Sequence, residues 1–203
     1  MPVNDNLESQ AYTIYKEWFI ENGEQHGAYN CLLTDIFDIF DSRRIPLSSQ
    51  ERADKAKTYP YYGANGLLDY VDNYLFDGIY VLMGEDGSVI TENGYPYLQY
   101  IWGKFWVNNH AHILQGKNGI STETLYLILL KTNIKNFVTG AVQAKISQEN
   151  LRAIPTISLD KEELTKFDAI IQPIFKTIRN NRMEMEYLIK LKNQLQAKLT
   201  YSD

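Results

Sequence analysis

The chain has 203 residues, of which 44% are hydrophobic, 22% are charged and 13% are aromatic. This length and composition suit one globular domain with an added element, and they exclude an intrinsically disordered chain. The single cysteine, Cys31, excludes an internal disulfide framework and a cysteine-based zinc site.

The sequence shows no sign of membrane insertion or export. Its longest apolar run, Leu125 to Leu130, is far shorter than the roughly 18–20 residues of a membrane span. The first residues lack the basic and apolar regions of a signal peptide. Together with the lone cysteine, these features predict a cytoplasmic protein with no membrane partner.

The charge balance is acidic, with a net charge of −5. Between residues 30 and 158 there are eleven Lys and Arg against thirteen Asp and Glu. Since phosphate neutralisation needs local Lys and Arg, bulk charge alone does not indicate a nucleic-acid partner. Any DNA-binding face must be a local patch, or partner proteins must supply much of the grip on phosphates.

The first predicted element is a helix over residues 6–20, where apolar side chains recur at helical spacing. Asn6 or Asp5 could cap it, and Gly23 would end it. A helix of about four turns is marginal alone in water, so this one needs a partner surface, such as a long helix of a second copy. Its predicted seam consists of Leu7, Ala11, Ile14 and Trp18.

Residues 30–158 are predicted to be rich in strands and turns, because glycines separate short runs dense in Tyr, Val, Ile, Phe and Trp. Asp86-Gly87 between two such runs predicts a hairpin. The runs are residues 78–83, 88–90, 105–107 and 111–114.

Residues 122–135 break the strand pattern with apolar side chains at helical spacing. Ser121 or Thr122 could cap this helix, and Glu123 lies in its first turn. The region is therefore a compact α+β domain.

The most regular pattern is at residues 160–200, where seam positions step by three and four without a slip, which favours a coiled coil. Pro173 would be its first residue or a kink. Polar seam residues usually fix register and partner number. The seam begins with Leu164, Phe167 and Ile171, and its predicted dimerisation residues are Ile174, Ile178, Asn181, Met185, Leu188, Lys192, Leu195 and Leu199.

The predicted organisation has three parts: a short helix at residues 1–22, a β-rich domain at 23–159 and a long dimerisation helix at 160–203. The fold class is α+β, with a β-rich domain containing a few helices, a long C-terminal coiled-coil helix and a short N-terminal helix.

Several segments, taken in order, resemble the specificity (S) subunits of type I restriction-modification systems. The first and last segments resemble that family's spacer helices, and those between resemble a target-recognition domain. The segments are residues 7–11 and 14–19, 59–66 and 76–78, 106–114, 140–143 with 146–147, 151 and 154–155, and finally Phe167, Pro173, Ile174, Ile178, Asn181 and Leu188.

The resemblance implies a non-catalytic chain, without a cofactor, that reads one half of a two-part target in double-stranded DNA. Antiparallel helices would form a rod that sets the gap between the halves and docks methyltransferase (M) and, through them, restriction (R) subunits. Family members usually carry two recognition domains and two spacer helices, whereas this chain holds one of each. Two explanations fit this difference: a natural half-subunit that forms a homodimer, or a truncated or cassette copy that is joined or recombined with another half.

Sequence readout needs polar side chains at groove edges, and positioning needs cations and backbone amides at phosphates. These candidates have structural alternatives. Arg43 and Arg44 could be a solvated surface pair, and the tyrosines could belong to a buried aromatic turn. Asn108 and Asn109 could be interior polar groups that join loops, and residues 139–145 could be a plain strand entry. Lys104 is expected on a hairpin end, near a phosphate. The candidate DNA contacts are Arg43, Arg44, Tyr61, Tyr62, Asn65, Lys104, Asn108, Asn109, Thr139, Gly140, Gln143 and Lys145.

Catalytic and metal-binding patterns are weak. His110 and His112 face the same way on a predicted strand, but no carboxylate or cysteine follows at ligand spacing, so no metal site is predicted. Asp35, Asp38 and Asp41 repeat every three residues and indicate one solvated face of a helix or turn. The alternatives are an adaptor dimer that binds protein or carbohydrate through the β-rich domain, and a stand-alone nuclease.

Overall fold

A computed structural model describes residues 2–21, 31–140 and 142–200. Within these ranges, no helix combines the length and apolarity needed to cross a lipid bilayer. The helices are α1 (Pro2–Tyr15, continued by a π-helical segment at Lys16–Glu21), α2 (Ser49–Ala53), α3 (Thr122–Leu130), α4 (Gln148–Arg152) and α5 (Lys161–Thr200), with 3-10 turns at Leu33–Asp35, Asp41–Arg43 and Lys135–Phe137. The strands are β1 (Cys31–Leu32), β2 (Phe37–Ile39), β3 (Tyr59–Gly63), β4 (Gly66–Val71), β5 (Phe76–Gly84), β6 (Leu98–Val107), β7 (Ala111–Gly116) and β8 (Pro155–Thr156).

Six strands form one sheet in the order β2-β7-β5-β6-β3-β4, in which only β3 and β6 are parallel. Side chains alternate across it: Val81 and Met83 of β5 belong to one apolar cluster, whereas Tyr80 and Leu82 belong to another. The sheet therefore has a core on each face, and the α+β class predicted from the sequence is confirmed.

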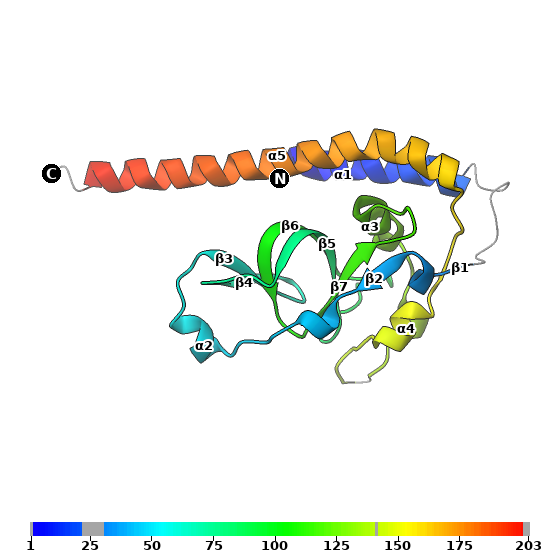
Figure 1. Ribbon diagram of the computed structural model, residues 1–203, viewed down its shortest axis with the longest axis horizontal. Helices are drawn as coiled ribbons and strands as arrows, with labels where there is room; N and C mark the ends of the chain where they lie inside the picture. Colours follow the sequence, from blue (N-terminus) through cyan, green and yellow to red (C-terminus); the bar gives the residue numbers. More distant parts are fainter. Residues whose placement is uncertain (1, 22–30, 141, 201–203) are drawn as a thin grey trace.

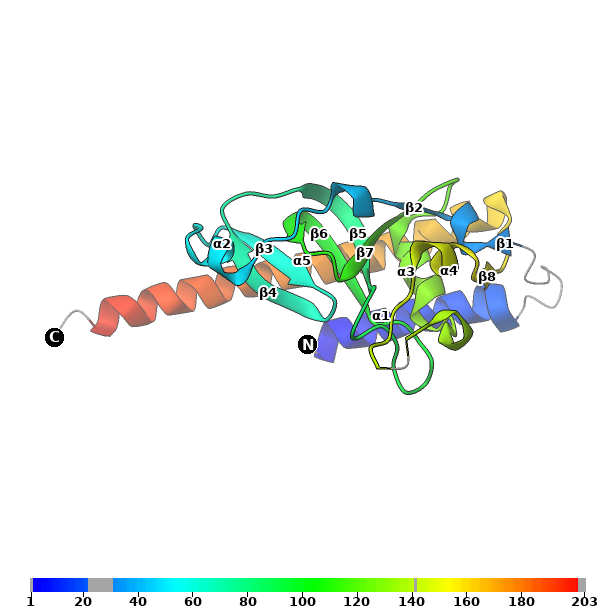
Figure 2. The ribbon, with the colours of Figure 1, turned by 90° about the horizontal axis from the view of Figure 1, so that it is seen from below.

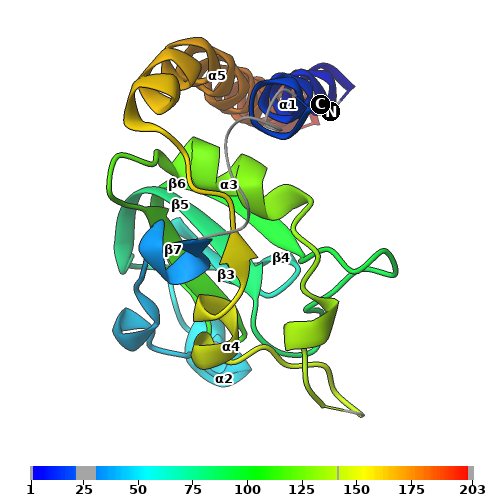
Figure 3. The same ribbon diagram turned by 90° about the vertical axis from the view of Figure 1, so that its right-hand side faces the viewer.

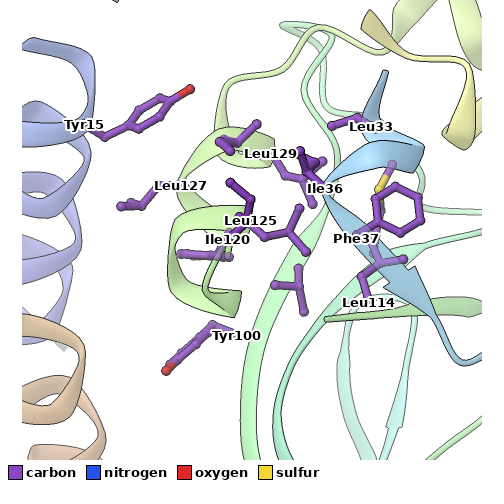
Figure 4. Packing of buried hydrophobic residues seen from close by; sticks show 14 of the residues in the cluster. Tyr15, Leu33, Ile36, Phe37, Tyr100, Leu114, Ile120, Leu125, Leu127 and Leu129 are labelled. Carbon is purple, nitrogen blue, oxygen red and sulfur yellow. The ribbon is translucent and has the colours of Figure 1, made fainter. Parts of the chain in front are cut away.

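Helix α3 lies between the sheet and the pair formed by α1 and α5 (Figure 1, Figure 3). Three of its leucines, Leu125, Leu127 and Leu129, are buried between the sheet and α1, as Figure 4 shows. Ser121 is its N-cap, since the Ser121 Oγ accepts a hydrogen bond from the Thr124 amide at 3.0 Å. The helix ends at Leu130, five residues before the predicted end.

Helix α1 runs antiparallel to α5 of the same chain. Near its start, Asn4 donates to the Ile178 carbonyl at 3.2 Å, and just after its end the Trp18 indole donates to Glu163 at 2.7 Å. The suggestion that α1 packs on a second copy is therefore wrong for this arrangement. The capping prediction is also wrong, because α1 already includes Pro2, while Gly23 lies outside the described residues.

Two further predictions need correction. Strand β5 pairs with β6 and β7, and residues 88–90 form no strand, so the Asp86-Gly87 turn does not make the predicted hairpin. Lys104 is not at a hairpin end but inside β6, opposite Asp77. Helix α5 continues through Pro173 without interruption, and its final part runs past the edge of the domain (Figure 2).

Candidate nucleic-acid interface

Four loops are joined by hydrogen bonds into one surface, which we call the loop cluster: residues 63–66, 85–88, 108–110 and 139–145 without Ala141. The Asn65 amide donates to the Ser88 hydroxyl at 2.6 Å, and the Gly87 amide donates to the Ala144 carbonyl at 2.9 Å. The Asn108 amide donates to the Tyr62 carbonyl at 3.0 Å. Segments far apart in sequence are thus brought together.

The loop cluster presents many of the predicted contact residues to solvent. The last of its loops lies on the side of the domain away from α5 (Figure 3). Gly140 adopts a φ of +91°, and a side chain there would meet the Gln143 carbonyl oxygen at 2.1 Å, so this turn requires glycine. The exposed candidates in the cluster are Asn65, Asn109, Thr139, Gly140, Gln143 and Lys145.

Three candidates are less exposed: two are buried and one is half-buried in a groove. Tyr61 is 1% exposed, and its hydroxyl bonds the Leu47 backbone. Tyr62 is half-buried in a groove on the side of α5, next to Arg182. Asn108 is buried, and its Oδ1 accepts from the His110 amide at 2.9 Å. For Tyr61 and Asn108 the structural alternative describes the geometry, and we correct their assignment as DNA contacts; the assignment of Tyr62 stays a prediction.

The two adjacent arginines have different surroundings. The Arg43 guanidinium is exposed, donates to the Leu75 carbonyl at 2.8 Å and lies 4.8 Å from the centre of the Phe76 ring. Lys104 is also exposed, with its Nζ 4.5 Å from the centre of the Tyr74 ring. Both cations therefore flank the turn before β5, outside the loop cluster, whereas Arg44 points inward.

Beneath the loop cluster lies a buried polar network. It includes Arg44, which was predicted to contact DNA, and Asp41, which was predicted to face solvent. Arg44 Nη1 donates to the Glu85 carboxylate at 2.6 Å. The assignment of Arg44 as a DNA contact is therefore corrected. Asp41, predicted on a solvated face, is 5% exposed. Its Oδ2 lies 2.6 Å from His112 Nδ1, and its Oδ1 accepts from the Ile113 amide at 2.9 Å. We call Asp41, Arg44, Glu85 and His112 the loop-side network.

Burial alone would raise the pKa of Asp41, but the hydrogen bond and charge of His112, the Ile113 amide and Arg44 together hold it below its ordinary value. The carboxylate is therefore ionised near neutral pH. Sequence analysis could not find it, because its partners come from distant segments.

The loop-side network contains three potential metal ligands, since ligand atoms of Asp41, Glu85 and His112 lie within 4.8 Å of one another. However, Arg44 already contacts both carboxylates, at 2.6 Å from Glu85 and 3.4 Å from Asp41. Both ring nitrogens of His112 also have protein partners. The geometry is that of an internal ion-pair network, in which a guanidinium takes the position that a metal cation would need.

A second buried network, built on β6, α3 and α5, attaches α5 to the domain. Glu123 of α3 accepts from the Tyr100 hydroxyl at 2.7 Å, from Arg179 at 2.7 Å and from Gln172 at 3.1 Å. Burial, followed by the charge of Glu123, raises the pKa of Tyr100, so its hydroxyl remains a donor. We call Tyr100, Glu123, Gln172 and Arg179 the rod-side network.

The sequence of the chain matches a profile of the type I restriction modification DNA specificity domain over residues 30–185. The chain belongs to this family. It is 37% identical over 142 residues to a putative type I restriction enzyme specificity subunit of Haemophilus influenzae, which covers 68% of this chain and 36% of that protein. It is 24% identical over 135 residues to the EcoprrI specificity subunit of Escherichia coli, covering 66% of this chain and 32% of that protein.

Solved structures show the same fold. The S subunit from M. genitalium superposes with a TM-score of 0.62 at 16% identity, covering 96% of this chain and 53% of that one. The HsdS subunit from Thermoanaerobacter tengcongensis gives 0.50 at 16% identity, covering 98% and 51%. The chain thus spans about a third of the curated relatives and half of the solved ones.

Family membership confirms the resemblance to type I specificity subunits that the sequence indicated. Type I specificity subunits recognise DNA and perform no catalytic step. The recognition domain of this specificity chain is fixed to α5 by the rod-side network, so the loop cluster has a defined orientation relative to the long helix.

Beyond the domain, α5 of the specificity chain exposes an apolar stripe, which we call the distal stripe. Side chains in this part have no covering element from the described chain, and Leu188 and Leu195 are 54% and 53% exposed. The exposed large apolar residues are Met183, Tyr187, Leu188, Ile189, Leu191, Leu195 and Leu199.

Proposed function

We propose that the chain reads one half of a two-part DNA target through its loop cluster. The observation that carries this proposal is the joining of four loops into one surface of exposed amide, hydroxyl and cationic groups. Asn109 and Gln143 can make the paired hydrogen bonds that distinguish adenine in the major groove, and Lys145 and the Gly140 backbone suit phosphates. Arg43 and Lys104 form a second cationic position for the DNA backbone.

We further propose that the chain acts as a homodimer and docks M and R subunits. The distal stripe supports this, because an exposed stripe of this length on a soluble helix usually faces another helix. Since α1 occupies the first part of α5, a second copy would lie along α5 from Met183 onward. Two recognition domains would then lie at a fixed separation.

The charge of the domain supports a need for partner proteins in DNA binding. Several of its cations are paired with acids: Lys55 lies 3.0 Å from Asp72, and Lys57 and Arg52 lie 3.1 and 3.3 Å from Asp69. We therefore propose that the M subunit provides much of the phosphate contact. The adaptor alternative has no supporting observation beyond the acidic balance.

Co-expression of the chain with its cognate M subunit, followed by mapping of methylated adenines by single-molecule sequencing, tests the proposal. We expect a symmetric, gapped, two-part motif. Gln143→Ala and Asn109→Ala should relax specific positions of that motif in both halves, since one domain type would read both. Gln50→Ala on the exposed face of α2 is the control and should leave the motif unchanged.

Methylation without a sequence motif, or a motif that Gln143→Ala and Asn109→Ala leave intact, would contradict readout by the loop cluster. An ungapped or asymmetric motif would instead contradict the homodimer.

A further inference from the structure

The loop-side network contacts the base of three loops of the cluster at once. Arg44 Nη1 bonds the Glu85 carboxylate at 2.6 Å, the Ala111 carbonyl at 2.9 Å and the Asn109 carbonyl at 3.3 Å. His112 Nε2 lies 3.0 Å from the carbonyl of Ile146, which follows the 139–145 loop. One arginine and one histidine thus connect the ends of loops that are far apart in sequence.

Asp41 holds both side chains in place. Its Oδ1 accepts from the Ile113 amide, while its Oδ2 contacts His112 and accepts from Gln148 of α4 at 2.8 Å. The backbone also closes the arrangement, since the Ile146 amide donates to the Glu85 carbonyl at 2.9 Å. The three loops are therefore attached to one central carboxylate through short polar contacts.

Both neighbours of the His112 ring are acceptors. Nδ1 lies 2.6 Å from the Asp41 carboxylate and Nε2 lies 3.0 Å from the Ile146 carbonyl, so the ring links the carboxylate to the base of a loop. Two carboxylates, from Asp41 and Glu85, contact the Arg44 guanidinium, and Lys145 Nζ lies 3.5 Å from Glu85. Removing one member of such a buried ion-pair group is costly, because its partner is left without a counter-charge.

Resting on the proposed function, we infer that Asp41, Arg44 and His112 are positioning residues for base readout: they act through the loops and touch no DNA. Hydrogen bonds to base edges need placement within about 0.5 Å and 10–20°, which exposed loops achieve only when a supporting layer fixes them. A small shift at the loop bases would therefore reduce discrimination between bases before it prevents DNA binding.

The rod-side network supplies a matched control. It is also a buried group with a carboxylate, Glu123, and an arginine, Arg179, 2.7 Å apart, but it joins α3 and β6 to α5 and includes no residue of the loop cluster. A substitution there should lower stability without moving the loops. The two networks therefore separate a loss of stability from a loss of positioning.

The test uses the complex of the chain with its cognate M subunit. Its DNA ligands are short duplexes that carry either the motif mapped by methylation or that motif with a single base pair changed in one half. The ratio of Kd for mismatched and matched duplexes is measured at one fixed salt concentration. For Arg44→Lys, which keeps the charge but loses the planar fork, we expect this ratio to fall about ten-fold. Glu123→Gln should lower Tm but leave the ratio within about two-fold of the parent.

Gln148→Ala provides a milder variant if Arg44→Lys does not fold, because Gln148 is exposed apart from its bond to Asp41. It should lower the ratio in the same direction by less. Unchanged discrimination in folded Arg44→Lys or Gln148→Ala, or an equal loss in Glu123→Gln, would overturn the inference. A parent complex that does not discriminate at all would instead overturn the proposed function.

Discussion

The two halves of α5 share one seam but lie in opposite environments. In the first half, Phe167 and Ile178 are fully buried against α1 and the domain. In the second half, Leu188, Leu195 and Leu199 are between 53% and 74% exposed. The comparison teaches that helical periodicity reports which face is apolar, but not whether the partner is the same chain or another.

The polar seam position in the first half makes the same point. Asn181 was predicted to set the register of a dimer, but its amide donates to Asn4 Oδ1 at 2.9 Å within the chain. Ile178 is likewise covered by its own chain. These predicted dimerisation residues are therefore corrected to intramolecular packing, and the proposed dimer interface begins at Met183.

The largest expected effect is on homodimerisation, and it comes from substitutions in the second half of α5. Leu188→Glu combined with Leu195→Glu places four charges in the proposed dimer interface and removes four leucines, each contributing about 1.5–3 kcal/mol when buried. We expect a monomer in analytical ultracentrifugation at concentrations where the parent is a dimer. The monomer should keep the far-UV spectrum of a folded domain.

Lys190→Glu, an exposed change off the seam of the same helix, is the control and should leave the dimer intact. A double variant that remains dimeric would remove the distal stripe from the proposed interface. A parent that is monomeric at every accessible concentration would contradict the dimer itself.

The second effect is on the stability of the folded chain, and it comes from substitutions in the first half of α5. Phe175 is fully buried and lies 5.0 Å from Tyr100 and 6.0 Å from Tyr126, measured between ring centres. We expect Phe175→Ala to lower the free energy of unfolding by about 3–5 kcal/mol, measured by urea denaturation. Leu195→Ala, measured in protein too dilute to associate, should change it by less than about 0.5 kcal/mol. Equal losses would show that both halves pack within one chain.

Much of the fold follows from local sequence patterns. The long helix, a cap at Ser121 or Thr122 and the strands around residues 78–83 and 111–114 were predicted because periodicity, capping and β-branched runs are local signals. The pairing of β5 with β6 was not predicted, because it joins residues that range from Met83 with Leu98 to Phe76 with Phe105, past an Asp-Gly turn that suggested a nearer partner. Pairing is a property of the whole sheet.

The candidate site was predictable in a similar, partial way. Residue types at glycine-containing turns indicated Asn65 and Gln143, and the polar cluster at residues 108–112 indicated Asn109; all three are exposed in the loop cluster. Asp41 and Arg44 were misassigned, because a charged residue's burial depends on partners that only the fold supplies. Local sequence separates turns from strands, but it does not separate a charge that contacts solvent from one that joins loops.

The smallest expected effect concerns the polar position of the second half. Lys192 is exposed and lies between Leu188 and Leu195 along the seam, so an antiparallel partner would place another lysine near it. Two like charges in an apolar interface oppose association and disfavour other registers. We expect Lys192→Leu to tighten the dimer by about ten-fold, or roughly 1.4 kcal/mol, in sedimentation equilibrium. Lys190→Leu, off the seam, should change it little. Weaker association of Lys192→Leu would mean that Lys192 pairs with an acidic side chain, and the register of the two helices would have to differ from the one proposed.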